Sequence, residues 1–330
     1  MFQSGNVIKW KHLCIRGIFS FYLYMPKIQD ISRSRLIWGI KFLVIGLGLV
    51  YLFYYLGSFS VEEVLVLEQF SPLKIMSLIS TLLCFSVLNW LGEIKKWQGL
   101  VGYISLNFSA KQTLIAHGLS LFTPQKLGEY GGKCLFYTKV ERYKIIALTG
   151  VGHFTQLMAT LMFGGFGVIV IFSEFNLFQL YSLKWSWVWL LFPFIVMLKP
   201  LRRQLKKIYQ HLKSIERHKI VKAFGWSLLR YMVFAHQFYV LLVVFEIQIE
   251  YATAMLGISL IYLMASILPV FSIADGLVKG SLALTIFGRF GFAAPSILTI
   301  VFLMWICNVI MPALIGYVWM LKWHPKLLIS

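Results

Sequence analysis

The sequence predicts an all-α, polytopic transmembrane helical bundle of about seven to eight spans, and three observations support this fold class. Hydrophobic residues make up 59% of the 330 residues, and the mean hydropathy is +0.78. Only 13% of the residues are charged, whereas a soluble domain carries about 25%. The apolar residues gather in runs that can cross roughly 30 Å of hydrocarbon as helices. Since no polar stretch is long enough to form a second core, we expect a single transmembrane domain over 37–321.

The N-terminal segment, 1–36, is basic and aromatic, which is typical of a stretch that lies in the headgroup region. The first span is expected at 37–57. The loop that follows carries three glutamates before its first basic residue, Lys74. Because cytoplasmic loops carry an excess of positive charge, this asymmetry predicts a cytoplasmic N-terminus.

A second span is expected at 73–91, and the region after it, 98–143, is broken by Pro124 and several glycines. The apolar runs of this region are too short to span, and both of its flanks are basic. It is therefore expected to form a re-entrant hairpin of half-helices, with a surface helical hairpin as the alternative. A long span follows at 145–172, where the glycines at 164–167 would allow close helix packing.

A tryptophan-rich apolar run at 185–198 precedes the strongest topological signal, the loop 199–222. This loop holds nine Lys or Arg residues against one acid, Glu216, which predicts a cytoplasmic position. Further spans are expected at 223–245, 252–271 and 295–321, with a second broken region, 272–292, before the last one. Seven full spans and two re-entrant segments would leave the C-terminus outside. The lysines after the last span favour the inside, so eight crossings are the alternative.

The net charge of +19 lies mainly in loops next to apolar runs. This placement indicates anionic membrane lipids as partners and argues against nucleic acid. The four cysteines lack the spacing of a disulfide framework or a metal site. No metal is expected, because His211 and His218 have no further ligands at suitable spacing. No cofactor is expected either, since the sequence contains no phosphate-binding or dinucleotide fingerprint.

The two broken regions resemble each other, which predicts an internal repeat of about 37–198 and 223–321. In each region a proline precedes an acid by five or six residues, and a lysine follows that acid by four. The residues are Pro124, Glu129 and Lys133 in the first region and Pro269, Asp275 and Lys279 in the second. In transporter folds, interrupted helices at matching places of two repeats point to a substrate site between them.

These motifs resemble the membrane domain of lysylphosphatidylglycerol synthases and of their stand-alone, flippase-like relatives. The matching residues are Pro124, Gly128, Glu129, Lys133, Glu141 and Arg142, with Pro269 and Gly276 near the second motif. Lys133 stands where arginine is usual, and Asp275 precedes Gly276 where the relatives have glycines followed by glutamate. The resemblance covers about 37–321.

The resemblance implies a helical bundle with two re-entrant elements in the cytoplasmic membrane of a prokaryote, and the movement or handling of a lipid with a polar headgroup. It does not imply aminoacyl transfer, because that chemistry requires a soluble catalytic domain and we expect none here. Enzymatic activity is therefore not the leading expectation.

Several intramembrane polar residues are candidates for substrate binding, because charges in the bilayer are costly without a function or a partner. They are Glu129, Lys133, Glu141, Arg142, Asp275, Lys279, His153, Gln156, Arg230 and His236. Each also has a structural explanation. The charge pairs would lock the re-entrant turns, and His153, Gln156 and His236 would bond between helices. Glu141 and Arg142 would anchor a span, while Arg230 and His117 would extend toward the headgroups.

The leading function is flippase-like transport or handling of an anionic lipid or lipid-linked saccharide. The alternatives are a membrane transferase that uses the same carboxylates as general bases, and a scaffold that binds envelope-biosynthesis proteins.

Overall fold

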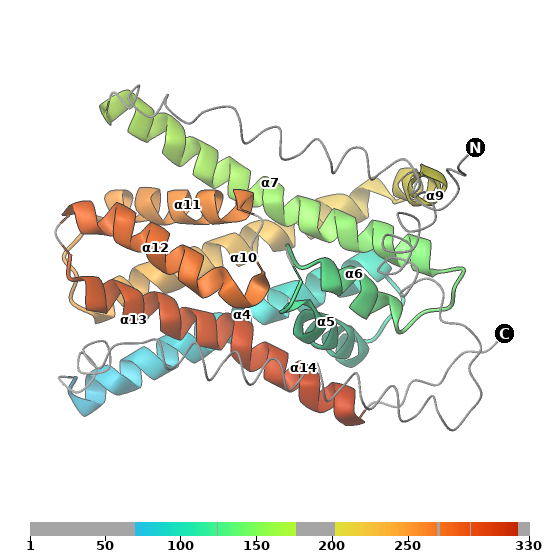
Figure 1. The fold of residues 1–330 in the computed structure, drawn as a ribbon, viewed down its shortest axis with the longest axis horizontal. Helices are drawn as coiled ribbons and strands as arrows, with labels where there is room; N and C mark the ends of the chain where they lie inside the picture. The colour runs from blue at the N-terminus through green and yellow to red at the C-terminus, as the bar shows by residue number, and fades with distance from the viewer. Residues whose placement is uncertain (1–69, 124, 176–201, 269–270, 291, 323–330) are drawn as a thin grey trace, which may run out of the picture.

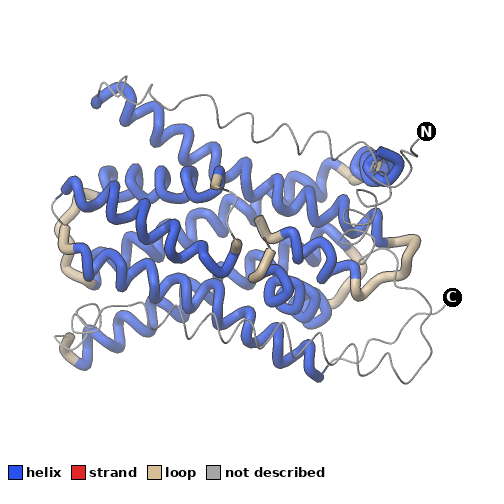
Figure 2. The backbone as a smooth tube through the Cα atoms, viewed as in Figure 1, coloured by secondary structure: helices blue, strands red, loops and turns tan. Residues whose placement is uncertain are grey.

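The computed structural model describes residues 70–123, 125–175, 202–268, 271–290 and 292–322. Every regular element in these residues is a helix, as the sequence predicts (Figures 1 and 2). The N-terminal segment 1–36, the expected spans at 37–57 and 185–198, Pro124 and Pro269 lie outside the described residues.

Four of the described helices are long and apolar enough to cross a membrane. They are α4 (Pro72–Val101), α7 (Arg142–Phe175), α10 (Arg217–Val244) and the continuous stretch of α13 (Ala294–Trp305), η6 (Ile306–Ile310) and α14 (Met311–Lys322). A short basic helix, α9 (Arg202–Lys213), precedes α10. These helices confirm the all-helical fold, and their length and composition are compatible with a multi-pass membrane protein. The total of seven to eight spans is not tested, because two of them fall outside the described residues.

Helix α4 extends beyond its predicted span. It begins after Ser71, whose side chain accepts a hydrogen bond from the Lys74 amide at 3.4 Å, and it ends at Gly102, where φ is 90°. The span expected at 73–91 stops before Glu93, yet the helix continues for ten more residues to Val101. The continuation is stable because the polar side chains of this last part are paired inside the protein, as described below.

The first broken region forms two short helices, α5 (Leu106–Ser120) and α6 (Leu127–Cys134). Between them, Gln125 and Lys126 adopt positive φ angles of 48° and 56°, which reverses the chain. The second broken region forms the matching pair α11 (Tyr251–Ile267) and α12 (Asp275–Phe287), joined through η4 (Ser272–Ala274). Each pair is a helical hairpin.

The full span expected at 252–271 is not present in that form. Helix α11 has 17 residues, or about 25 Å of helix, which is short of the roughly 30 Å of a hydrocarbon core. The chain turns back after α11, so α11 runs to the middle of the molecule and α12 returns toward the same end (Figure 1). The end of α14 consequently lies at the same end of the molecule as α9 and the start of α10 (Figure 1).

The tips of the two hairpins meet in the middle of the molecule (Figure 2). The Gln125 side chain donates from Nε2 to the Leu268 carbonyl at 2.6 Å. The Ile273 amide donates to the Leu121 carbonyl at 3.1 Å. The two broken regions, which the sequence pairs only by resemblance, are therefore in direct contact.

Each hairpin packs on a long helix from the other part of the chain. Hairpin helix α5 packs on α14, while α11 packs on α7. Helices α4 and α10 pack against each other and run in opposite directions (Figure 1). Antiparallel packing of this kind is also what an inverted repeat would produce.

Close packing of α7 on α11 depends on one glycine. A Cβ atom at Gly164 would lie 2.6 Å from Leu263 Cβ, whereas one at the neighbouring Gly165 would meet nothing within 4 Å. We expect Gly164→Ala to lower the free energy of unfolding in detergent by about 1–3 kcal/mol, because overpacking forces the helices apart. Gly165→Ala is the matched control and should be neutral or stabilising by up to ~1 kcal/mol. Equal effects of the two changes would contradict this packing.

Candidate functional site

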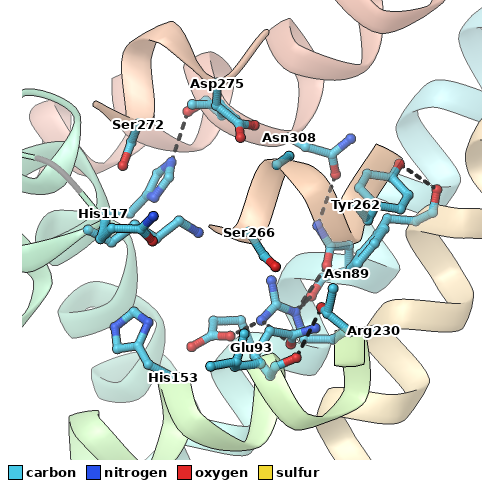
Figure 3. A pocket seen from close by; sticks show the side chains of 18 of the residues that line it. Asn89, Glu93, His117, His153, Arg230, Tyr262, Ser266, Ser272, Asp275 and Asn308 are labelled. Atoms are coloured by element: carbon cyan, nitrogen blue, oxygen red, sulfur yellow. Dashed lines mark hydrogen bonds and ion pairs between the residues drawn. The ribbon is translucent and has the colours of Figure 1, made fainter. Parts of the chain in front are cut away.

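A cavity of about 640 Å³ lies between the two hairpin tips and the long helices (Figure 3). Both halves of the chain contribute to its wall, from Asn89 on α4 to Asn308 on η6. His117 and His153 lie on one side of the opening, Ser272 and Asp275 on a second, and Glu93 and Arg230 on a third. The cavity is therefore where the predicted repeat would place a substrate site.

One wall of the cavity holds three charged side chains, Glu93, Lys96 and Arg230, which we call the Glu93 cluster. Lys96 Nζ lies 2.7 Å from Glu93 Oε2, and the Arg230 guanidinium donates to the same carboxylate oxygen. Lys96 is 3% exposed and also donates to the Gly152 carbonyl at 3.2 Å. One carboxylate thus faces two cations, so this cluster carries one net positive charge.

Arg230 does not extend toward the headgroups as expected from the sequence. Its Nε donates to the Asn89 side chain at 3.0 Å and its Nη1 to Gln156 at 3.2 Å, and its side chain is only 11% exposed. A Cβ at Gly92 would lie 2.6 Å from Arg230 Cγ, so that glycine leaves room for the side chain. Arg230 turns inward because a carboxylate and two amides satisfy it there.

A chain of amides continues from this cluster to the last span. Asn89 donates to Asn308 at 3.0 Å, Asn308 donates to Gln237 at 2.9 Å, and Trp90 donates to the Asn308 carbonyl at 3.1 Å. Asn308 belongs to η6, a π-helical turn, and such turns are frequent at functional sites. Gln237 of α10 thus forms hydrogen bonds to both α4 and η6.

Glu129 is the centre of a second group, which we call the Glu129 cluster, with Lys133, His117 and His153. The carboxylate lies 3.3 Å from His153 Nε2 and 3.8 Å from both His117 Nδ1 and Lys133 Nζ. Lys133 Nζ also lies 4.1 Å from the centre of the Trp97 ring. Glu129, Lys133 and His117 are all at least 94% buried. His117 therefore packs inside the protein, contrary to the expectation that it reaches the headgroups.

The second hairpin contributes the pair Asp275 and Lys279, with 2.7 Å between the ammonium and the carboxylate. Lys279 also lies 5.3 Å from the Tyr262 ring. Both members of the pair line the cavity, as does Glu129 of the first hairpin. The four-residue spacing that is common to both motifs thus places an ion pair on each hairpin.

Of the other candidates, Gly276 lines the cavity, whereas Glu141, Arg142, His236 and Gly128 do not. Glu141 accepts from the Thr138 hydroxyl at 3.0 Å, and Arg142 begins α7. His236 links α10 to α11 through the Tyr251 hydroxyl at 2.9 Å. Gly128 and Gly276 serve close packing: a Cβ would lie 2.6 Å from the Leu119 carbonyl at the first and 2.8 Å from the Trp305 ring at the second.

Sequence reasoning missed Glu93 and Lys96 because it ended a span at residue 91. It also missed Asn89 and Asn308, which lie inside expected spans and were not singled out as polar candidates. The i, i+3 spacing of Glu93 and Lys96 was a usable signal, since it places both on one helix face. Within the described residues, no group of three or more His, Cys, Asp or Glu side chains is arranged to hold a metal ion.

Comparison of the chain with protein-family models, with curated proteins and with solved structures found no match.

Proposed function

We propose that this protein binds the headgroup of an anionic membrane lipid and moves it across the bilayer, in the manner of a flippase. The observation that carries the proposal is the charge of the cavity. Its described lining includes four cations (Lys96, Lys126, Arg230 and Lys279) against three acids (Glu93, Glu129 and Asp275). Because buried positive charge without a counterion is costly, an anionic group is the favoured occupant.

The rim of the cavity favours a lipid over a soluble anion. Leu127, Phe154, Leu157 and Leu268 line the cavity, and each is between 39% and 58% exposed. These side chains come from α6, α7 and the turn after α11, and they give the opening an apolar border. A phosphate-containing headgroup would lie inside while its acyl chains cross this border into the bilayer.

We further propose that the two hairpins are re-entrant and that the end of the bundle with α9 faces the cytoplasm of a prokaryotic cell. Segment 202–222 and Lys322 lie at this end (Figure 1). The positive-inside rule favours that orientation, and so does the attraction of about 1 kcal/mol per basic side chain to anionic lipid. Neither hairpin helix pair is long enough to span twice, which favours re-entrance.

Removal of the Lys96 charge, which leaves the Glu93 cluster neutral, tests the proposed function. We expect Lys96→Met to keep the fold, because the charges of Glu93 and Arg230 still balance each other. We also expect it to weaken anionic lipid binding about tenfold, because one charge-assisted contact is lost. The measurement is translocation of a fluorescent anionic phospholipid in vesicles, with a zwitterionic analogue in parallel. Lys95→Met is the control, since it removes the same charge from an adjacent position outside the cavity. Wild-type selectivity in folded Lys96→Met protein would contradict the proposal.

A further inference from the structure

Glu129 is held unusually loosely for a buried carboxylate. Among the described residues, no side-chain nitrogen that faces Glu129 is closer than 3.3 Å, whereas the ammonium of Lys279 lies 2.7 Å from Asp275. The nearest nitrogen belongs to His153, and His117 and Lys133 are each 3.8 Å away. Charge-assisted N–H···O bonds normally measure 2.7–2.9 Å, so none of these three nitrogens forms a tight ion pair with the carboxylate.

One nitrogen of the His117 ring faces the Glu129 carboxylate, so a proton on either group would make their contact attractive. His117 Nε2 lies 3.1 Å from the Val309 carbonyl, which can only accept, so Nε2 carries a hydrogen. The other ring nitrogen, Nδ1, is buried, faces the Glu129 carboxylate and has no hydrogen-bond partner among the described residues. A neutral ring would therefore direct a lone pair at a carboxylate oxygen. The contact becomes attractive when a proton resides either on His117 Nδ1 or on Glu129.

Several aromatic and charged side chains surround the contact between His117 and Glu129, and they affect how favourable a proton is there. His153 approaches the carboxylate from α7 and stacks on Tyr130 at 5.3 Å between ring centres, while Trp90 of α4 packs edge-on against the His117 ring at 4.7 Å. Lys133 faces Glu129 from the same helix. The Glu93 cluster lies across the cavity, with Glu93 and Lys96 on α4 and Arg230 on α10. The pair Asp275–Lys279 on α12 also lines the cavity. A proton added here raises the positive charge of the cavity by one.

We propose that Glu129, His117 and His153 form a proton-binding site that couples movement of the anionic headgroup to movement of a proton. This inference rests on the proposed function. A proton from water on one side binds to the carboxylate or to the facing imidazole nitrogen, and the more positive cavity admits the anionic headgroup. Loss of the proton to water on the other side weakens the hold on the headgroup and releases it. One O–H or N–H bond forms and breaks in each cycle, and no other bond changes.

The first experiment detects the proton without any lipid movement. The full chain, purified in detergent, is examined by infrared difference spectroscopy for carboxyl protonation and by nitrogen NMR of labelled histidines, in mildly acidic and mildly alkaline buffer. We expect a pH-dependent signal from Glu129 or His117 that is lost or altered in Glu129→Gln and in His153→Gln. His236→Gln removes a histidine outside the cavity and should leave this signal intact. A cluster that gives no pH-dependent signal in wild-type protein would overturn the inference.

The second experiment measures coupling in vesicles with an imposed proton gradient. We expect the gradient to accelerate anionic lipid translocation by wild-type and His236→Gln proteins, and we expect this response to be lost in Glu129→Gln. If Lys96→Met keeps wild-type lipid selectivity, the proposed function fails. If lipid moves selectively but at the same rate with and without the gradient, the function stands and the proton coupling is wrong.

Discussion

Glu93→Gln is expected to lower the free energy of unfolding by about 3–5 kcal/mol, the usual result of removing one partner from a buried ionic group. The Glu93 side chain is 13% exposed and is the carboxylate shared by Lys96 and Arg230. Without it, two buried cations face each other across a short distance. Unfolding by denaturant in detergent micelles measures the loss.

Two further variants make this prediction specific. Glu93→Gln combined with Lys96→Met should be more stable than Glu93→Gln alone, because it removes one of the two unbalanced cations. Glu216→Gln is the matched control at the surface, where the hydrogen bond from Lys219 at 2.9 Å lowers the pKa of the Glu216 carboxyl. Because Glu216 is solvent-exposed, its replacement should change stability little. Equal losses at positions 93 and 216 would contradict the buried ionic cluster.

Cross-linking of the hairpin tips is expected to stop lipid movement almost completely. Gln125 Nε2 and the Leu268 carbonyl are 2.6 Å apart, so cysteines at positions 125 and 268 lie within reach of a short bifunctional thiol reagent. The experiment uses a chain whose four native cysteines have been replaced. The tips border the cavity from both halves, and alternating access in repeat-built transporters requires the halves to move against each other.

The reagent joins each cysteine through a disulfide, so that a thiol reductant cleaves the cross-link. Mass spectrometry reports the cross-link, and the vesicle assay reports the movement of lipid before and after this reductive cleavage. Cysteines at positions 140 and 268 provide the control, because Val140 is 84% exposed in the connection between α6 and α7 and does not line the cavity. Failure of the 125–268 pair to cross-link would contradict the contact between the hairpins. Rapid lipid movement by the cross-linked protein would show that the tips need not separate.

Local features of the sequence determined the parts of this structure that depend on neighbouring residues. Apolar runs of sufficient length specified the long helices, because a helix satisfies its own backbone hydrogen bonds in any apolar environment. The spacing of Asp275 and Lys279 specified an ion pair on one helix face, and the glycine at position 164 marked a close helix contact. The sequence also revealed that the two broken regions resemble each other, since each contains a proline, an acid and a lysine at similar spacing.

Only the tertiary structure decided which of these local elements meet. Arg230 donates a hydrogen bond to Glu93, which lies 137 residues away in the sequence. Because of this partner, the Arg230 side chain is part of the cavity wall, whereas the sequence predicted that it extends toward the headgroups. The partner also lets α4 continue past residue 91 with buried charges. Helix α11 is apolar enough to be a span by composition, but its length and its contact with the first hairpin make it half of a hairpin. The physical reason is the same in each case: the cost of burying a charge or of ending a helix inside the bundle depends on partners that lie far away in the sequence.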